Sequence, residues 1–156
     1  MLPSGDQCIA HHEAGHAVAA IRLGVILDRA TSDHCFIWHP RDRASLENVL
    51  VILLSGFAAE QRFAPAALQL QVYRDTGGDF ADAQTVLLEM GGDPSNGDLG
   101  RYVQRAKELV EQNWFAIRCV AARLRYEGDL DGYRVREIVE NCDLIDRERE
   151  LRSGLR

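Results

Sequence analysis

The sequence lacks three features that would each assign it to a large class of proteins. Its 156 residues contain no apolar run of about eighteen residues, and the longest, Ala14–Ile21 and Val49–Leu54, have the length of core helices. The four cysteines form no CxxC pair, and the net charge is −6 rather than positive. These absences argue against a membrane span or signal peptide, against a cysteine-ligated zinc site or disulfide scaffold, and against a nucleic-acid-binding surface.

The remaining composition is ordinary for one globular domain spanning residues 1–156, with 46% hydrophobic and 27% charged residues. We expect the scattered cysteines to be buried free thiols in a reducing compartment, which makes the cytoplasm the expected location. The arginines near the C-terminal end are interleaved with acidic and apolar residues, so we expect them to line solvated helix faces. They are Arg118, Arg123, Arg125, Arg134 and Arg136.

The spacing of apolar residues predicts a mainly α-helical fold, compact, with one short strand or hairpin after the first helix. The strand is expected over Cys35–Trp38, and Pro65 is expected to end a helix and begin a linker to Asp75. The expected helices run from about Asp6 to Leu23, from near Ser45 to Phe63, from Thr76 to Gly91, from Leu99 to Gly128, and onward from a cap at Asp131.

The most informative motif is His-Glu-Ala-Gly-His at residues 12–16, inside a segment that is apolar nearly all round. On a helix, residues four apart are separated by about 40° around the axis, so His12 and His16 lie on one face and can both bind zinc. Glu13 then borders the metal as a general base for water. The ordinary alternative is a set of polar-face residues, but polar groups in a buried helix need partners.

Two neighbours of this motif carry further expectations. His11 is five residues from His16, about 140° away around the helix, so it cannot share a metal with His16. We expect the His11 side chain either to contact the metal ligands without binding the metal or to be partly exposed. Gly15 costs about 1 kcal/mol relative to alanine in a helix, which indicates close approach of a neighbouring backbone or a substrate.

A catalytic zinc ion usually takes three protein ligands and a water, so a third ligand must come from elsewhere in the chain. Asp79 follows two glycines in the first turn of an expected helix, but it could equally form a capping box with Thr76. Glu60 could be a ligand or accept the free N–H of a ligand histidine. The spacing leaves the candidates open: His34, His39, Glu60, Asp75, Asp79, Asp82 and Glu89.

Three segments then occur in a telling order: His12-Glu-Ala-Gly-His-Ala, Leu54-Ser-Gly-Phe-Ala-Ala-Glu60 and Thr76-Gly-Gly-Asp-Phe-Ala-Asp-Ala83. In this order they resemble the peptidase domain of the FtsH family of AAA+ membrane-bound zinc metalloproteases. Val110-Glu-Gln-Asn-Trp-Phe-Ala-Ile and Leu130-Asp-Gly-Tyr-Arg-Val are similar to later parts of that domain. The resemblance covers about Cys8 to Glu140.

The resemblance implies a zinc metalloendopeptidase in which His12, His16 and Asp79 bind Zn2+ and Glu13 is the catalytic base. It implies a supporting role for Glu60 behind the ligands, and a polypeptide substrate. A purely structural zinc ion is less expected, because structural sites usually have four protein ligands and favour cysteine. The alternative function is a catalytically quiet, peptidase-like module that binds peptides or regulates a partner.

The chain also departs from the family. Nothing in it matches the ATP-binding pattern GxxxxGK[ST], and we expect no membrane anchor ahead of the motif. We therefore expect a stand-alone peptidase domain that works with a separate ATPase or unfoldase, as a monomer or an oligomer. Cys35–Trp38 is the only segment that could pair with an extended substrate, provided that it is an edge strand.

Overall fold

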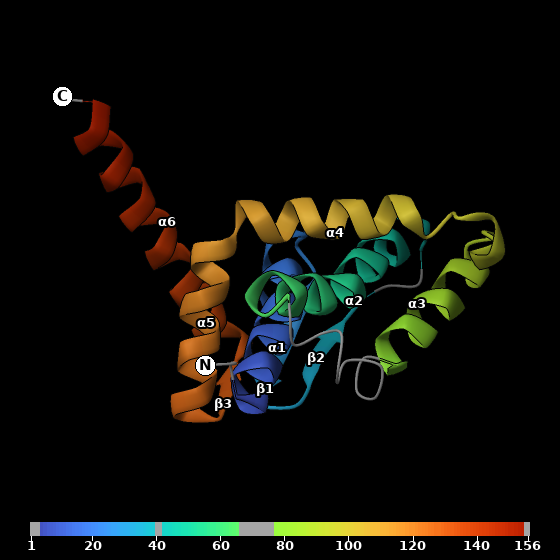
Figure 1. Cartoon of the computed structure of the whole chain (residues 1–156), viewed down its shortest axis with the longest axis horizontal. Coiled ribbons are helices and arrows are strands. Elements are labelled where there is room, and N and C mark those ends of the chain that lie inside the picture. Colours follow the sequence, from blue (N-terminus) through green and yellow to red (C-terminus); the bar gives the residue numbers. More distant parts are fainter. Residues whose placement is uncertain (1–3, 40–41, 66–76, 155–156) are drawn as a thin grey trace.

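The computed structural model of the chain describes residues 4–39, 42–65 and 77–154. The described part is mainly α-helical with a small antiparallel sheet, as the sequence predicts (Figure 1). The elements are α1 (Gly5–Arg22), β1 (Ile26–Thr31), β2 (Cys35–Trp38), α2 (Arg43–Phe63), α3 (Gly77–Glu89), the short 3-10 helix η2 (Pro94–Asn96), α4 (Gly100–Gln112), α5 (Trp114–Glu127), β3 (Asp129–Asp131) and α6 (Gly132–Gly154).

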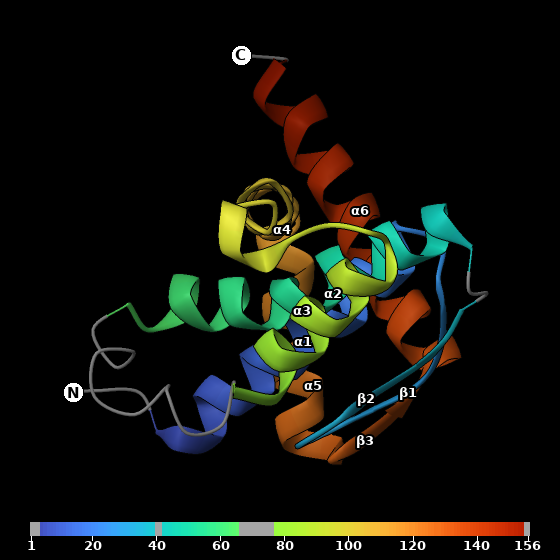
Figure 2. The ribbon, with the colours of Figure 1, turned by 90° about the vertical axis from the view of Figure 1, so that its right-hand side faces the viewer.

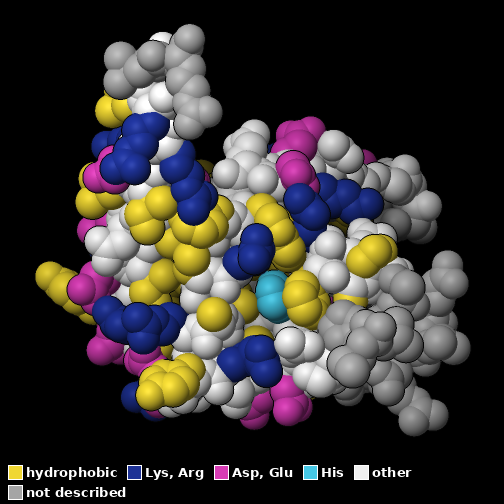
Figure 3. Space-filling model, turned by 60° about the vertical axis from the view of Figure 1, so that its left-hand side comes forward, with side chains coloured by type: hydrophobic (Ala, Val, Ile, Leu, Met, Phe, Trp, Pro, Cys, Tyr) yellow, Lys and Arg dark blue, Asp and Glu magenta, His cyan; other side chains and the backbone are white. Residues whose placement is uncertain are grey.

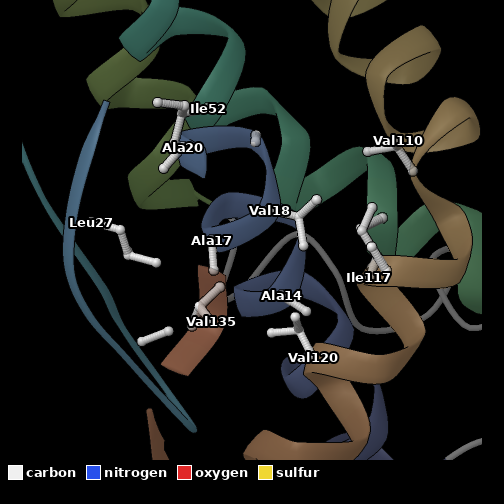
Figure 4. Close-up of a cluster of buried hydrophobic side chains, with 14 of the residues drawn as sticks. Ala14, Ala17, Val18, Ala20, Leu27, Ile52, Val110, Ile117, Val120 and Val135 are labelled. Carbon is white, nitrogen blue, oxygen red and sulfur yellow. The ribbon is translucent and has the colours of Figure 1, made fainter. Parts of the chain in front are cut away.

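Helix α1 occupies the centre of the molecule, with α2, α5 and the sheet around it (Figures 1 and 2). Its core positions are small, and Ala14, Ala17 and Val18 are completely buried. Figure 4 shows these side chains between those of α5, β1 and α6, including Val120, Leu27 and Val135. Small residues let the surrounding elements approach closely, so residues 10–20 of α1 are all buried, and the polar side chains of His12, Glu13 and His16 are buried with them.

Gly15 is where α1 and α2 come closest. A Cβ atom at this position would lie 2.5 Å from the carbonyl oxygen of Ser55 and 2.7 Å from the Cβ of Ala59. Both distances are shorter than real contacts, so only glycine permits this approach. The sequence-based expectation that Gly15 admits a neighbouring backbone is confirmed, and the approach brings α2 against the face of α1 that carries His12 and His16.

The sheet has the strand order β2-β1-β3 with antiparallel pairs, so β2 is an edge strand. The predicted strand at Cys35–Trp38 and the predicted hairpin are confirmed, whereas β3 and its pairing with β1 were not foreseen. Along β2, burial alternates: Cys35 and Ile37 pack against the core, while Phe36 and Trp38 are exposed. The strand therefore has one face toward α1 and one toward solvent.

The prediction of one long helix from Leu99 to Gly128 is wrong. The chain turns at Asn113, and α4 and α5 run in nearly perpendicular directions in Figure 1. The Asn113 side chain explains the break, because its Nδ2 donates to the carbonyl oxygen of Leu109 at 2.8 Å and its Oδ1 accepts from Arg22 Nε at 2.6 Å. A side chain that bonds the backbone competes with helix continuation.

The other helix limits agree closely with the sequence. Helix α1 begins after Ser4 rather than after Asp6, because the Gln7 side chain accepts from the Ser4 N–H at 3.0 Å, and it ends before Gly24, which has φ 69°. Asp42 caps α2, and Asp131 caps α6 as predicted, accepting from the Arg134 N–H at 2.7 Å. The expected linker and the start of the third helix at Thr76 lie outside the described residues.

Helix α6 extends beyond the body of the molecule at its C-terminal end (Figures 1 and 2). In the space-filling view, Lys and Arg side chains on this side are separated by hydrophobic and acidic ones (Figure 3), as expected for solvated helix faces. The four cysteines are free, as predicted; Cys8 and Cys142 are buried, whereas Cys35 and Cys119 are only half-buried. Among the described residues, no helix is both long and apolar enough to span a membrane.

Candidate metal centre

Helix α1 presents His12 and His16 on one face, one turn apart. Both are buried, at 8% and 6% exposure, and their Nε2 atoms lie 3.0 Å from each other. The rings meet edge to face, with centroids 4.6 Å apart. The helical spacing thus aims two nitrogens at the same point, as the motif predicts.

Helix α3 contributes the third group of this cluster. Asp79 lies in the first turn of α3, and its Oδ2 is 2.8 Å from His12 Nε2 and 3.3 Å from His16 Nε2. The structure therefore brings Asp79 to the two histidines from a position more than sixty residues along the chain. Of the open candidates for a third ligand that the structure describes, Asp79 is the one whose carboxylate joins the pair.

The hydrogen bonds of the two Nδ1 atoms determine whether the Nε2 atoms, which face Asp79, are donors or acceptors. His16 Nδ1 lies 2.7 Å from the carbonyl oxygen of Ile52, and His12 Nδ1 lies 3.2 Å from Glu60 Oε2. A carbonyl oxygen can only accept, so His16 carries its proton on Nδ1, and a carboxylate at Glu60 demands the same of His12. When both rings are neutral, their Nε2 atoms direct lone pairs at Asp79.

Three acceptor atoms this close together require a positive charge between them. Two imidazole nitrogens and a carboxylate oxygen are ligands that divalent transition metals accept, and tetrahedral zinc bonds of about 2.0–2.1 Å place ligand atoms about 3.3 Å apart. The observed separations of 2.8, 3.0 and 3.3 Å are close to this value. His12, His16 and Asp79 form a group that could hold a metal ion.

Gly56 of α2 keeps the space around the inward nitrogens open. A Cβ atom on Gly56 would lie 2.8 Å from His12 Nε2 and 2.5 Å from His16 Cε1, and it would overlap His16 Nε2. Any side chain there would displace the two rings. The packing of α2 against the two imidazole rings thus requires the absence of a side chain at position 56.

The pKa values of His12 and Asp79 also indicate that the cluster favours a positive charge. Burial opposes the charged form of His12, yet the hydrogen bonds from Asp79 and Glu60 outweigh it and raise its pKa to about 9. Burial also opposes the charged form of Asp79, and its hydrogen bonds to His12 and His16 hold its pKa well below the usual range. A proton and a metal ion compete for the same place among these groups.

Glu13 lies beside the cluster on α1 and is 6% exposed. Burial raises the pKa of its carboxyl; the charges of His16 and His12 oppose this rise, and Asp79 adds to it. Within the described residues, no hydrogen bond or ion pair engages this carboxyl group. A carboxylate whose pKa is raised and whose oxygens make no hydrogen bond accepts a proton more readily than an ordinary exposed one, which is what a general base must do.

The other candidate ligands lie elsewhere. His34 is in the β1–β2 turn, 3.6 Å from Asp33 and stacked on Phe36. Asp82 and Glu89 are exposed on α3, and His39 follows β2. Asp75 and Thr76 lie outside the described residues, so the capping box that the sequence offered as an alternative role for Asp79 is not described.

His11 points away from the cluster, as its helical angle requires. It is buried rather than partly exposed, stacked on Phe63 with centroids 3.6 Å apart and near Trp114 at 5.7 Å. Its Nδ1 donates to the carbonyl oxygen of Gln7 at 2.7 Å, and burial lowers its pKa. His11 fixes the rotation of α1 through stacking and does not support the ligands directly.

Two contributors to the centre were not foreseen from the sequence. Gly56 carried a detectable signal, since a glycine inside an otherwise apolar helix is costly unless something approaches it closely. The carbonyl oxygen of Ile52 carried none, because every residue has one. Comparison with known protein families and with curated proteins finds no match for this chain.

Proposed function

We propose that the chain is a zinc-dependent metalloendopeptidase that hydrolyses peptide bonds with water, using Glu13 as the general base. The carrying observation is the convergence of His12 Nε2, His16 Nε2 and Asp79 Oδ2 beside the buried, unpaired carboxyl of Glu13. The resemblance of the surrounding motifs to FtsH-type peptidase domains supports the same assignment.

In this proposal His12, His16 and Asp79 hold the zinc ion. When bound there, zinc is a Lewis acid that lowers the pKa of water toward neutrality and polarises a carbonyl group. Glu13 accepts a proton from the attacking water and passes it to the leaving amine. Glu60 and the carbonyl oxygen of Ile52 keep both imidazoles in the tautomer that leaves Nε2 free.

The position of β2 supports a polypeptide substrate. Within the described residues no strand pairs with its outer edge, so its backbone can pair with an extended peptide. The pKa of Cys35 is raised by burial and then by the charges of Glu13 and Asp79, which means that the inner face of β2 is near both groups. β2 packs against α1, the helix that carries Glu13. A peptide along β2 would pass beside Glu13.

The test is degradation of casein, an unfolded substrate, by the purified chain. Wild-type protein with zinc is expected to degrade casein, and a chelator is expected to stop it. Glu13→Gln is expected to retain zinc and to lose turnover by a factor of about 10² or more. Proteolysis that persists in Glu13→Gln would overturn the assignment of the base. Zinc binding without any proteolysis would favour a catalytically quiet peptide-binding module.

The ligand set is tested separately by metal analysis after dialysis. Asp79→Ala is expected to retain much less zinc than wild type, because one of three protein ligands is lost. Asp82→Ala, which changes an exposed carboxylate on the same helix, is the matched control and should retain zinc fully. Equal zinc contents in wild type and Asp79→Ala would contradict the proposed ligand set. Addition of a separate unfoldase is expected to matter for folded substrates only.

A further inference from the structure

Two arginines of α5 lie on one face of that helix and have no partner. Arg118 and Arg125 are seven residues apart, so they differ by only about 20° around the helix axis and by about 10 Å along it. Both residues are exposed, and within the described residues neither side chain forms a hydrogen bond or an ion pair. Each guanidinium group therefore keeps its N–H donors for a ligand.

Other arginines on α5 and α6 are already paired with acidic side chains. Arg123 and Arg134 both contact Glu127, at 3.3 and 3.7 Å. Near the centre of Figure 3, Lys and Arg side chains surround a histidine and hydrophobic side chains, and acidic side chains lie farther out. The unpaired arginines thus give a local positive charge to a chain whose net charge is −6. Such a site attracts negatively charged ligands.

Aromatic rings lie beside the two arginines. Trp114 is one turn before Arg118 on the same face of α5, and its ring is 5.7 Å from that of His11, which stacks on Phe63. Burial lowers the pKa of His11, and the charges of Arg118 and Arg125 lower it further, so both guanidinium groups are near this ring. Trp114 and Phe63 are half-buried, and the exposed part of each ring can hold an apolar side chain.

We infer that Arg118, Arg125 and Trp114 form a docking face for an acidic segment of a partner polypeptide. The segment has two carboxylates roughly 10 Å apart, which matches the spacing of the arginines, and an apolar side chain between them that packs on the aromatic rings. Each guanidinium group can donate two N–H groups to one carboxylate. A single small anion such as phosphate is smaller than this spacing, and the net charge of −6 disfavours a nucleic acid.

The docking face is separate from the candidate metal centre. His11 is about 140° from His16 around α1, and its ring points away from the cluster of His12, His16 and Asp79. A partner on this face would hold the chain without covering the centre. The inference therefore goes beyond the proposed function and does not depend on it.

The test compares wild-type protein with the double variant Arg118→Gln/Arg125→Gln by fluorescence anisotropy. Arg123→Gln/Arg134→Gln is the matched control, because it removes the same charge from arginines that already pair with Glu127. The probe is a fluorescein-labelled peptide with a pair of glutamates on each side of a central leucine. Comparison probes have glutamine in place of glutamate, or serine in place of leucine. A labelled single-stranded oligonucleotide is the nucleic-acid probe.

For the glutamate peptide at low salt, the Kd is expected to rise about tenfold in the double variant and to change by less than about twofold in the control. The peptide with serine is expected to bind wild-type protein more weakly than the peptide with leucine. The glutamine peptide is expected to bind weakly and equally to all proteins. Added salt should weaken the binding of the glutamate peptide to wild type. Circular dichroism verifies that each variant is folded.

Several results would overturn the inference. One is an unchanged Kd for the glutamate peptide in the double variant, and another is an equal loss in the control, which would show a dependence on net charge alone. Tighter binding of the oligonucleotide than of the glutamate peptide would assign the face to nucleic acid. Binding of the glutamate peptide that a zinc chelator abolishes would assign it to the metal centre. Peptide binding that persists without any proteolysis would sustain the inference while the proposed peptidase activity fails.

Discussion

The two histidines of the centre are held by different kinds of partner. His12 depends on a side chain, Glu60, at 3.2 Å, whereas His16 depends on a main-chain carbonyl oxygen at 2.7 Å. Partners of this kind set the ring orientation and the basicity of the ligand nitrogen. The metal affinity of the chain should therefore respond to position 60.

We predict that Glu60→Ala weakens zinc binding by about 10–100-fold, because His12 loses the acceptor that fixes its tautomer. Glu60→Gln, whose amide oxygen can still accept the proton, is expected to lose less. Competition with a fluorescent zinc chelator measures both affinities. Arg62 lies on the same turn of α2 as Glu60 and forms an ion pair with Glu111 of α4. Glu111→Ala is therefore the control, and it should leave the zinc affinity unchanged. Equal affinities of Glu60→Ala and wild type would refute this role.

Gly56→Ala is predicted to abolish zinc retention, because its Cβ would overlap His16 Nε2 and crowd His12 Nε2 at 2.8 Å. The rings would have to leave their positions. Gly100→Ala is the matched control, since a Cβ there meets nothing within 4 Å. Metal analysis after dialysis is the measurement, with circular dichroism to verify folding. Full zinc content in a folded Gly56→Ala protein would show that the glycine is not needed by the cluster.

At the level of single residues, most of the candidate metal centre could be predicted from the sequence. Helical spacing alone placed His12, Glu13 and His16, because residues four apart share a face. Asp79 and Glu60 could not be chosen by spacing, since a long-range contact depends on how α1, α2 and α3 pack. The resemblance to a known family supplied that choice, and the structure brings both residues to His12.

Among the elements, α1 is tied to α6 by an ion pair at the surface. Arg22 at the end of α1 donates to both oxygens of Asp143 at 2.9 and 2.5 Å, and also to Asn113 between α4 and α5. The hydrogen bonds from Arg22 lower the pKa of Asp143. One side chain thus joins three helical segments at a single point.

Asp143→Asn is predicted to lower the free energy of unfolding by about 0.5–1 kcal/mol at neutral pH, because both side chains of the pair are about one-third exposed. The folded state holds the pKa of Asp143 below its unfolded value of about 3.9, so the contribution is full above that pH. It is lost as the pH falls through the folded pKa. The difference between variant and wild type should therefore shrink in acid.

Urea unfolding at neutral pH and at about pH 3 measures this difference. Asp146→Asn, which removes an exposed pair with Arg149 at 3.6 Å, is the control and should change stability by only a few tenths of a kcal/mol. A loss in Asp143→Asn that is the same at both pH values would argue against the ion pair as its cause.

The elements themselves were predictable where capping residues mark their ends. Gly24, Asp42 and Asp131 stand at helix limits for simple backbone reasons, and the limits agree within a few residues. The break at Asn113 was missed because the apolar spacing continues through it. The bond from the Asn113 side chain to the carbonyl oxygen of Leu109 is local, but the bond from Arg22 that holds this side chain is long-range, and no local pattern contains that information.

For the whole molecule, the centre joins three helices that are distant in sequence. The cluster takes His12 and His16 from α1 and Asp79 from α3. From α2, Glu60 contacts His12 Nδ1 and Gly56 packs against both imidazole rings. A ligand that binds only the folded state stabilises it in proportion to its affinity. Metal occupancy and folding should therefore be coupled.

We predict that a chelator lowers the Tm of wild-type protein by several degrees and lowers the amide-exchange protection of α3 more than that of α5. The reason is that α5 is held by the apolar core around α1, whereas the first turn of α3 is bound to α1 through Asp79. Differential scanning fluorimetry and hydrogen exchange are the measurements. Asp79→Ala should show no further change with chelator, and an equal loss of protection in both helices would contradict the coupling.

The hydrogen bond from His16 to the carbonyl oxygen of Ile52 has a genetic consequence. Every amino acid carries a main-chain carbonyl, so no codon change at position 52 that preserves the helix can remove this acceptor. Glu60, in contrast, can be lost by a single substitution. The acceptor for His12 can therefore be lost through a single substitution, whereas the acceptor for His16 is inherited with the course of the backbone itself.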